Sequence, residues 1–184
     1  MPLRKLTESD LDKMLEWRNA PDVRKNMYSS HEITKTEHRN WFAGLEHNQS
    51  ARWYIYTDDE GNSQGVVYFT NYAPRSGSVF WGFYSAPHAP RGVGSRMEIA
   101  ALDHAFADLG VHKLNCEVLA SNPKVINLHK KFGFSEEGQF QEYHFDGEHY
   151  LTVVRLGMLA REWPNNRQLA LEQLAKKSTA IKPE

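Results

Sequence analysis

Residues 88–97 read HAPRGVGSRM, and this glycine loop lies between an aromatic segment and an apolar helical pattern. A loop that opens a helix presents unpaired backbone N–H groups at the positive end of the helix dipole, where phosphate binds. Gly92 and Gly94 let the backbone approach such an anion without intervening side chains. Glycine also marks ordinary turns. The loop by itself therefore leaves two interpretations open, a phosphate cradle and a plain turn.

Two common nucleotide-binding motifs do not fit the loop. Met97 occupies the third glycine position of the dinucleotide fingerprint, and the string G-x-x-x-x-G-K-[ST] occurs nowhere in the chain. A nicotinamide-dependent enzyme and a P-loop hydrolase are therefore disfavoured.

Apolar spacing after the loop predicts a long helix that ends at Gly110. The other segments show the alternation and aromatic content of strands, or the capping residues of helices. These patterns predict, in chain order, a strand at 3–7, helices at 11–17 and 34–45, a strand meander at 52–57, 64–72 and 77–85, a helix at 92–109, a strand at 112–119, a helix at 123–132, a hairpin of 134–145 with 149–159, and a terminal helix within 161–177. The fold class is α/β (α+β), with a mixed, mostly antiparallel seven-stranded sheet flanked by helices.

Bulk composition indicates one soluble globular domain. The chain has 184 residues, with 22 basic and 23 acidic residues and a formal net charge of −1, so no global field favours nucleic acid or an anionic membrane. No apolar stretch approaches the ~20 residues of a membrane span. Cys116 is the single cysteine, which excludes an internal disulfide. We expect a cytoplasmic protein in which the Cys116 thiol is reduced and buried.

The glycine loop, followed by EVLASNPKVINLHKKFGF at residues 117–134, resembles the GNAT superfamily of acetyl-CoA-dependent N-acyltransferases. The resemblance implies a GNAT domain over 1–158, a helical extension at 159–184, and acetyl-CoA as the co-substrate. In this family the loop binds the cofactor pyrophosphate, the later segment borders its pantetheine and thiol, and a splayed strand offers N–H groups to the acetyl carbonyl. The cofactor residues implied are Phe83, Tyr84, Ser85, Arg91, Gly92, Val93, Gly94, Ser95, Arg96, Asn122 and His129.

Glu117 is the candidate general base, because strand alternation places its side chain on the face opposite Cys116 and Val118. Its separation of twelve residues from His129 resembles RimI-type acetyltransferases, which have a glutamate base and a tyrosine acid at this separation. The resemblance implies that His129 replaces the tyrosine as acid, and an imidazolium can donate a proton to a thiolate. The alternatives are a strand-edge charge for Glu117 and a core histidine for His129.

Residues 16–42 combine cationic and aromatic side chains. They predict either a site for an anionic, ring-containing ligand or an amphipathic helix pair with a basic solvent face. The pattern W-R-N-x-P-x-V-R-x-x-M followed by E-H-x-x-W resembles the PseH family of bacterial pseudaminic acid biosynthesis, which acetylates a UDP-linked 4-amino-4,6-dideoxy sugar. The substrate residues implied are Arg24, Met27, His38, Trp41, Trp81 and Tyr84.

The leading hypothesis is direct transfer of acetyl from acetyl-CoA to the amino group of an amino-sugar nucleotide. The alternatives are acetylation of a ribosomal protein, another protein N-terminus or a polyamine, and a non-catalytic acyl-CoA-binding module. His144 and His149 face each other across the predicted hairpin, but two ligands without a third do not favour a metal site, so we expect no metal. We expect no nucleic acid or membrane partner, and a homodimer is left open.

Overall fold

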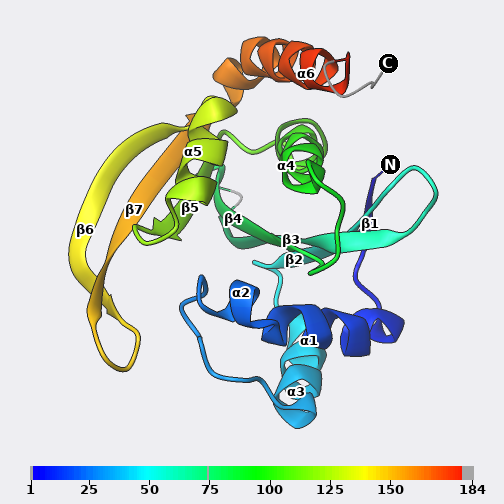
Figure 1. The fold of residues 1–184 in the computed structure, drawn as a ribbon, viewed down its shortest axis with the longest axis vertical. Helices are drawn as coiled ribbons and strands as arrows, with labels where there is room; N and C mark the ends of the chain where they lie inside the picture. Colours follow the sequence, from blue (N-terminus) through cyan, green and yellow to red (C-terminus); the bar gives the residue numbers. More distant parts are fainter. Residues whose placement is uncertain (1, 74, 180–184) are drawn as a thin grey trace.

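The computed structural model describes residues 2–73 and 75–179 and shows one sheet between two groups of helices (Figure 1). Within these residues the sheet has seven strands in the order β1-β2-β3-β4-β5-β7-β6, which confirms the predicted class. The strands are β1 Leu3–Lys5, β2 Arg52–Thr57, β3 Ser63–Ala73, β4 Ser78–Ser85, β5 Lys113–Leu119, β6 Ser135–Phe145 and β7 Tyr150–Leu159. The helices are α1 Leu11–Asn19, α2 Pro21–Arg24, α3 Lys35–Leu45, α4 Val93–Asp103, α5 Pro123–Lys131 and α6 Trp163–Thr179.

The helices divide between the two faces of the sheet. Figure 1 shows α1, α2 and α3 on one face, and α4, α5 and α6 on the other. The short helix α2 was not predicted, and Pro21 opens it at the first helical position. The predicted helix after the glycine loop is α4 continued by a π-helical turn over His104–Asp108. No helix within residues 2–73 and 75–179 is long and apolar enough to cross a membrane.

The centre of the sheet contains a parallel strand pair. The described pairs other than β4–β5 are antiparallel, whereas β4 and β5 run parallel. Their register begins at Ser78↔Lys113 and ends at Phe80↔Asn115, although both strands continue further. We call the separated parts, 81–85 of β4 and 116–119 of β5, the splay. The splay lies at the middle of the sheet, where both groups of helices can reach it.

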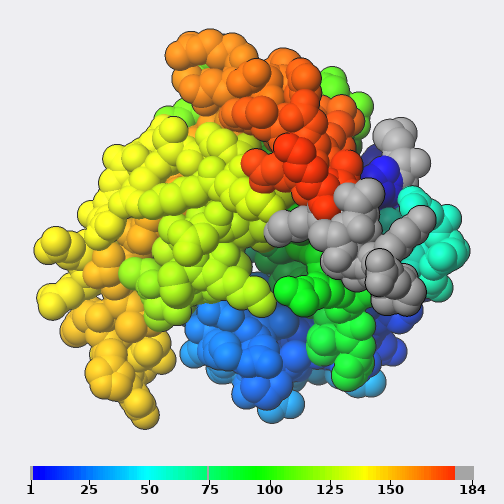
Figure 2. Space-filling model, turned by 45° about the horizontal axis from the view of Figure 1, so that its top comes forward, coloured from blue at the N-terminus to red at the C-terminus, as the bar shows by residue number. Residues whose placement is uncertain are grey.

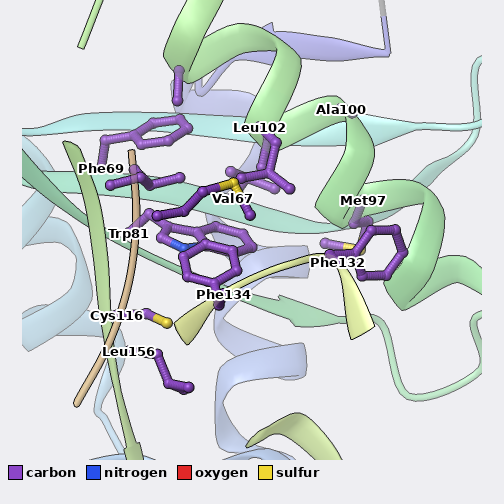
Figure 3. Close-up of a cluster of buried hydrophobic side chains, with 14 of the residues drawn as sticks. Val67, Phe69, Trp81, Met97, Ala100, Leu102, Cys116, Phe132, Phe134 and Leu156 are labelled. Carbon is purple, nitrogen blue, oxygen red and sulfur yellow. The ribbon is translucent and has the colours of Figure 1, made fainter. Parts of the chain in front are cut away.

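The main hydrophobic core lies between the sheet and α4, α5 and α6. In this core Trp81 stacks on Phe134 with ring centroids 6.0 Å apart (Figure 3). Cys116 is 2% exposed in the same cluster, as predicted for a buried thiol. A second cluster joins the opposite face to α1 and includes Met14, Trp17 and Tyr84. Successive β4 side chains thus enter different cores, and only the second core borders α1 and α3.

Helix α6 is attached to the main core by its first turns. Trp163 is 4% exposed and donates through Nε1 to Asp103 Oδ1 at 2.9 Å. Arg167 binds the same carboxylate at 2.7 and 3.0 Å. Figure 2 shows α6, coloured orange to red, on the same side of the molecule as α5. Of the extension predicted at 159–184, residues 180–184 lie outside the described residues.

Candidate active site

The glycine loop forms the N-terminal end of α4. Gly92 is the N-cap of this helix and has a φ of +87°, in the left-handed region that favours glycine. The Val93 N–H is already bonded to Pro90 O and the Arg96 N–H to Gly92 O, whereas the Gly94 and Ser95 N–H groups have no acceptor within their own helix. These groups form a site for a pyrophosphate at the positive end of the helix dipole. The loop therefore fits the cofactor position implied by the resemblance.

The splay presents backbone donors from β4. Along β4 the backbone N–H groups of successive residues point alternately toward β3 and away from it. The Ala86 N–H points toward β3, because it donates to Gln64 O at 2.8 Å. By this alternation the Tyr84 N–H points to β3, and the Phe83 and Ser85 N–H groups point away from β3, into the splay. Of the three donors predicted for the acetyl carbonyl, two have the required direction. The Tyr84 side chain lies in the second cluster, on the α1 side of the sheet.

A cavity of about 400 Å³ lies on the α1 side of the sheet, next to the splay. Met27, His38, Trp41 and Tyr84, four of the six predicted substrate residues, line it. Its full lining is Met14, Arg18, Met27, Tyr28, Ser29, His31, Ile33, Glu37, His38, Trp41, Trp53, Tyr68 and Tyr84. We call it the acceptor cavity, because Tyr84 belongs to the splayed part of β4.

Two predicted substrate residues lie outside the acceptor cavity. Trp81 is 3% exposed and belongs to the main core on the α4 side, because it points to the face of β4 opposite Tyr84. Arg24 Nη1 lies 3.8 Å from Glu32 Oε2, and Arg24 is not a lining residue. The guanidinium that lines the cavity is that of Arg18, in the same predicted segment as Arg24.

One wall of the acceptor cavity is a series of aromatic rings. Trp53 stacks on Tyr68 with centroids 4.5 Å apart, and Trp41 meets Trp53 edge-on at 4.7 Å. His38 stacks on Trp41 at 5.2 Å. Such a wall suits a flat or ring-shaped ligand, because aromatic faces bind rings and sugars through large apolar contacts.

Three polar atoms of the lining are buried without a partner in the part of the chain that the structure describes. They are Arg18 Nη1, His38 Nε2 and the Tyr84 hydroxyl. Arg18 is fixed by its other nitrogen, which donates to Ser29 O at 2.6 Å. Burial lowers the pKa of Arg18 and of His38, and raises the pKa of Tyr84. Buried polar groups are usually hydrogen-bonded, so these three atoms are available to the polar atoms of a bound ligand or of water.

Glu117 lies on the α1 side of β5, opposite Cys116, as the alternation predicts. Its Oε1 accepts from Arg155 Nη1 at 2.7 Å, and its Oε2 accepts from the Tyr28 hydroxyl at 2.9 Å. Arg155 also stacks its guanidinium 4.1 Å above the centre of the Phe80 ring. Arg155 and Tyr28 were not predicted as partners of Glu117. The register Glu117↔Arg155 explains the ion pair, but a register between distant strands is not visible in a local pattern.

His129 lies on the other face of β5, within the main core. It is 2% exposed and its ring contacts the rings of Trp81, Phe83 and Phe134. Its Nδ1 lies 2.8 Å from Oε1 of Glu98, a fully buried residue of α4.

Burial disfavours the charged form of the His129 imidazole, but Glu98 and then Cys116 raise the pKa of His129 to about 10. Glu117 and His129 are therefore on opposite faces of the splayed part of β5.

Asn122 has the local role expected of an N-cap. Its side chain accepts a hydrogen bond from the Val125 N–H at 3.4 Å, and Pro123 begins α5. A contact of Asn122 with the cofactor stays a prediction.

Residues 1–135 match the family model described as "Acetyltransferase (GNAT) domain", and the chain belongs to this family. A spermidine N(1)-acetyltransferase of Vibrio cholerae is 30% identical over 124 residues, which are 66% of this chain and 71% of that protein. Acetyltransferase PseH of Campylobacter jejuni is 25% identical over 139 residues, covering 76% and 85%. A crystal structure of the Vibrio cholerae spermidine N-acetyltransferase with CoA and spermine matches with a TM-score of 0.83 and 26% identity, over 89% of this chain and 97% of that one.

The family, the fold and these relatives make the protein an acetyl-CoA-dependent N-acetyltransferase. The name of the Vibrio cholerae relative gives a polyamine as acceptor, whereas the name of the Campylobacter jejuni relative gives none, so similarity does not identify the acceptor here. The acceptor has to be inferred from the chemistry of the cavity.

Proposed function

We propose that this enzyme acetylates the amino group of a nucleotide-linked amino sugar, such as a UDP-4-amino-4,6-dideoxy sugar. The observation that supports the proposal is the set of unpartnered polar atoms of Arg18, His38 and Tyr84 in an aromatic cavity. A buried donor without an acceptor costs about 1–3 kcal/mol. A diphosphate and sugar hydroxyls supply hydrogen-bond partners for all three groups, and a nucleotide base supplies a ring for the aromatic wall.

A polyamine is the second candidate, because the Vibrio cholerae relative is named for spermidine. Polyamines are polycations, and their binding is favoured by carboxylates and opposed by a nearby cation. Glu37 is the one carboxylate among the described lining residues, and it is already bonded to Thr34 and His31. Arg18 places a positive charge in the same cavity. The charges of the cavity therefore favour an anionic acceptor over spermidine.

In this proposal acetyl-CoA supplies an activated thioester, and the protein supplies orientation and proton transfer. The N–H groups of the first turn of α4 bind the pyrophosphate. The Phe83 and Ser85 N–H groups stabilise the negative charge that develops on the carbonyl oxygen. Glu117 accepts the proton of the amine, and the His129 imidazolium, kept charged by Glu98, is the proposed acid for the thiolate.

A panel of acceptors tests the proposal. The purified protein is mixed with acetyl-CoA and, separately, with UDP- and dTDP-linked amino sugars, spermidine and N-terminal peptides, while release of free thiol is followed. We expect the highest kcat/KM for an amino-sugar nucleotide, and competitive inhibition of that reaction by the free nucleoside diphosphate. A higher kcat/KM for spermidine, or tight acetyl-CoA binding without turnover on any amine, would reject the proposal.

A further inference from the structure

Tyr28 connects the acceptor cavity with Glu117. The Tyr28 side chain lines the cavity, and its hydroxyl donates to Glu117 Oε2 at 2.9 Å. Glu117 is not among the described residues that line the cavity. Tyr28 therefore contacts both the space for the acceptor and the carboxylate that has to receive its proton.

Each carboxylate oxygen of Glu117 accepts one described hydrogen bond, and the Glu117 side chain is 21% exposed. Oε1 is held by Arg155 at 2.7 Å, and a guanidinium does not give up its proton in a protein. Oε2 is held by Tyr28, whose hydroxyl can both donate and accept. A general base acts on a proton within hydrogen-bond reach, directly or through one intermediate group. Tyr28 is an intermediate group already in place.

Tyr28 is not suited to be the final base. Burial, followed by the hydrogen bond to Glu117, raises the pKa of its phenol. Tyr28 is therefore a neutral phenol at physiological pH, and it can accept a proton only while it releases its own. Its ring also contacts His144 of β6, with centroids 4.8 Å apart, which helps to hold the hydroxyl in position.

We propose that Tyr28 is a further catalytic residue that relays the proton of the acceptor amine to Glu117, an inference that rests on the acceptor cavity and base of the proposed function. The amine nitrogen bonds to the carbonyl carbon, and the carbon–sulfur bond breaks with its electron pair on sulfur. The surplus proton on nitrogen moves to the Tyr28 oxygen while the phenol proton moves to Glu117 Oε2. The thiolate takes one proton from the acid, and Glu117 and the acid exchange protons with water after product release, so that protons balance.

Tyr28→Phe tests the relay, because it removes the hydroxyl and keeps the ring. Loss of a proton-transfer group typically lowers the rate by about 10²-fold or more. We expect kcat to fall by about this factor, with an unchanged dissociation constant for acetyl-CoA and an unchanged thermal midpoint. The matched control is Tyr150→Phe, since Tyr150 is 66% exposed and lies outside the cavity lining. We expect this control to keep the turnover of the parent enzyme.

A double-mutant cycle of Tyr28→Phe and Glu117→Gln separates a relay from two independent effects. If both residues act in one proton path, the double variant is no slower than Glu117→Gln alone. Multiplied losses, or full turnover of Tyr28→Phe, would overturn the relay. The rates are measured with the amine of the panel that has the highest kcat/KM, whether amino sugar or spermidine. The cycle therefore stays decisive even where the nucleotide-sugar proposal fails.

Discussion

Glu98 and His129 form a buried pair that joins α4, which begins at the glycine loop, to α5. Oε1 of Glu98 lies 2.8 Å from Nδ1 of His129, and the two side chains are 0% and 3% exposed. The second oxygen of Glu98 has no partner in residues 2–73 and 75–179. Removal of either side chain would leave the charge of the other buried without a counter-charge, so each stabilises the folded state only in the presence of the other.

The pH dependence of the free energy of unfolding should reveal how much this pair stabilises the folded state. The pKa of His129 is raised from 6.5 to about 10 in the folded protein, so between these values the folded state binds more protons than the unfolded state. The stabilisation is complete below the unfolded pKa and is lost as the pH rises through the folded pKa, with a slope of at most about 1.4 kcal/mol per pH unit. Urea unfolding across this range should show the decline, and Glu98→Gln should flatten it. Glu136→Gln, which removes an exposed ion pair with Lys130, is the control and should leave the slope unchanged.

Substitutions of His129 should distinguish an acid from a core residue. If His129 is the acid, His129→Phe lowers kcat by about 10²-fold with little change in the KM for acetyl-CoA, and His129→Tyr, which keeps a proton donor, recovers part of the loss. Steady-state kinetics and thermal unfolding of both variants make the comparison. A loss of stability in His129→Phe with an undiminished kcat would assign His129 to the core alone.

Glu117→Gln should remove turnover and keep cofactor binding. The amide retains the size of the side chain, and its oxygen can still accept from Arg155 while its NH2 group donates to the Tyr28 hydroxyl, but it does not take up a proton at neutral pH. We expect kcat to fall by about 10²- to 10⁴-fold and the dissociation constant for acetyl-CoA to stay unchanged in calorimetry. Glu137→Gln, which lies outside the acceptor cavity and pairs with Lys113 at 2.6 Å, serves as the control. Equal turnover of both variants would exclude Glu117 as the base.

The conformation of Gly92 gives a test of the cofactor site. Its φ of +87° costs about 1–2 kcal/mol for a residue with a Cβ atom. We expect Gly92→Ala to lower the free energy of unfolding by that amount and to raise the KM for acetyl-CoA, because the N–H groups of the loop shift. Gly44→Ala is a suitable control, since an added Cβ there meets no atom within 4 Å and Gly44 lies in α3. An unchanged KM in Gly92→Ala would show that the loop tolerates a side chain.

Local signals in the sequence predicted most of the elements correctly. The capping box of Thr34 and Glu37 is present at the start of α3, and Asn122 caps α5 as expected. The π-helical turn over His104–Asp108 was not predicted, because apolar spacing does not distinguish it from the end of a long α-helix. The two caps depend on neighbours within a few residues, which is why the sequence predicts them.

The direction of a candidate site residue was predicted where its own strand determines that direction. Strand alternation predicted that Glu117 lies on the face of its strand opposite Cys116. The structure confirms this direction, because Cys116 lies in the main core and Glu117 contacts Tyr28 on the α1 side. The partners of the charged residues were missed, because Arg155 and Glu98 come from elements far along the chain. The pairing of Glu98 with His129 depends on how two helices pack, and the sequence shows only a carboxylate within an apolar helical stripe.

Arg18→Gln should distinguish the two candidate acceptors. A hydrogen bond to a charged group contributes about 1.5–3 kcal/mol, so loss of the guanidinium from the cavity should lower kcat/KM for an amino-sugar nucleotide by about 10- to 150-fold. Turnover of spermidine should be unchanged or faster, because a repulsive charge is gone. Arg24→Gln is the matched control, since Arg24 pairs with Glu32 outside the lining, although the sequence pattern favoured it as the substrate residue. A larger loss in Arg24→Gln than in Arg18→Gln would place the anionic group of the acceptor outside this cavity.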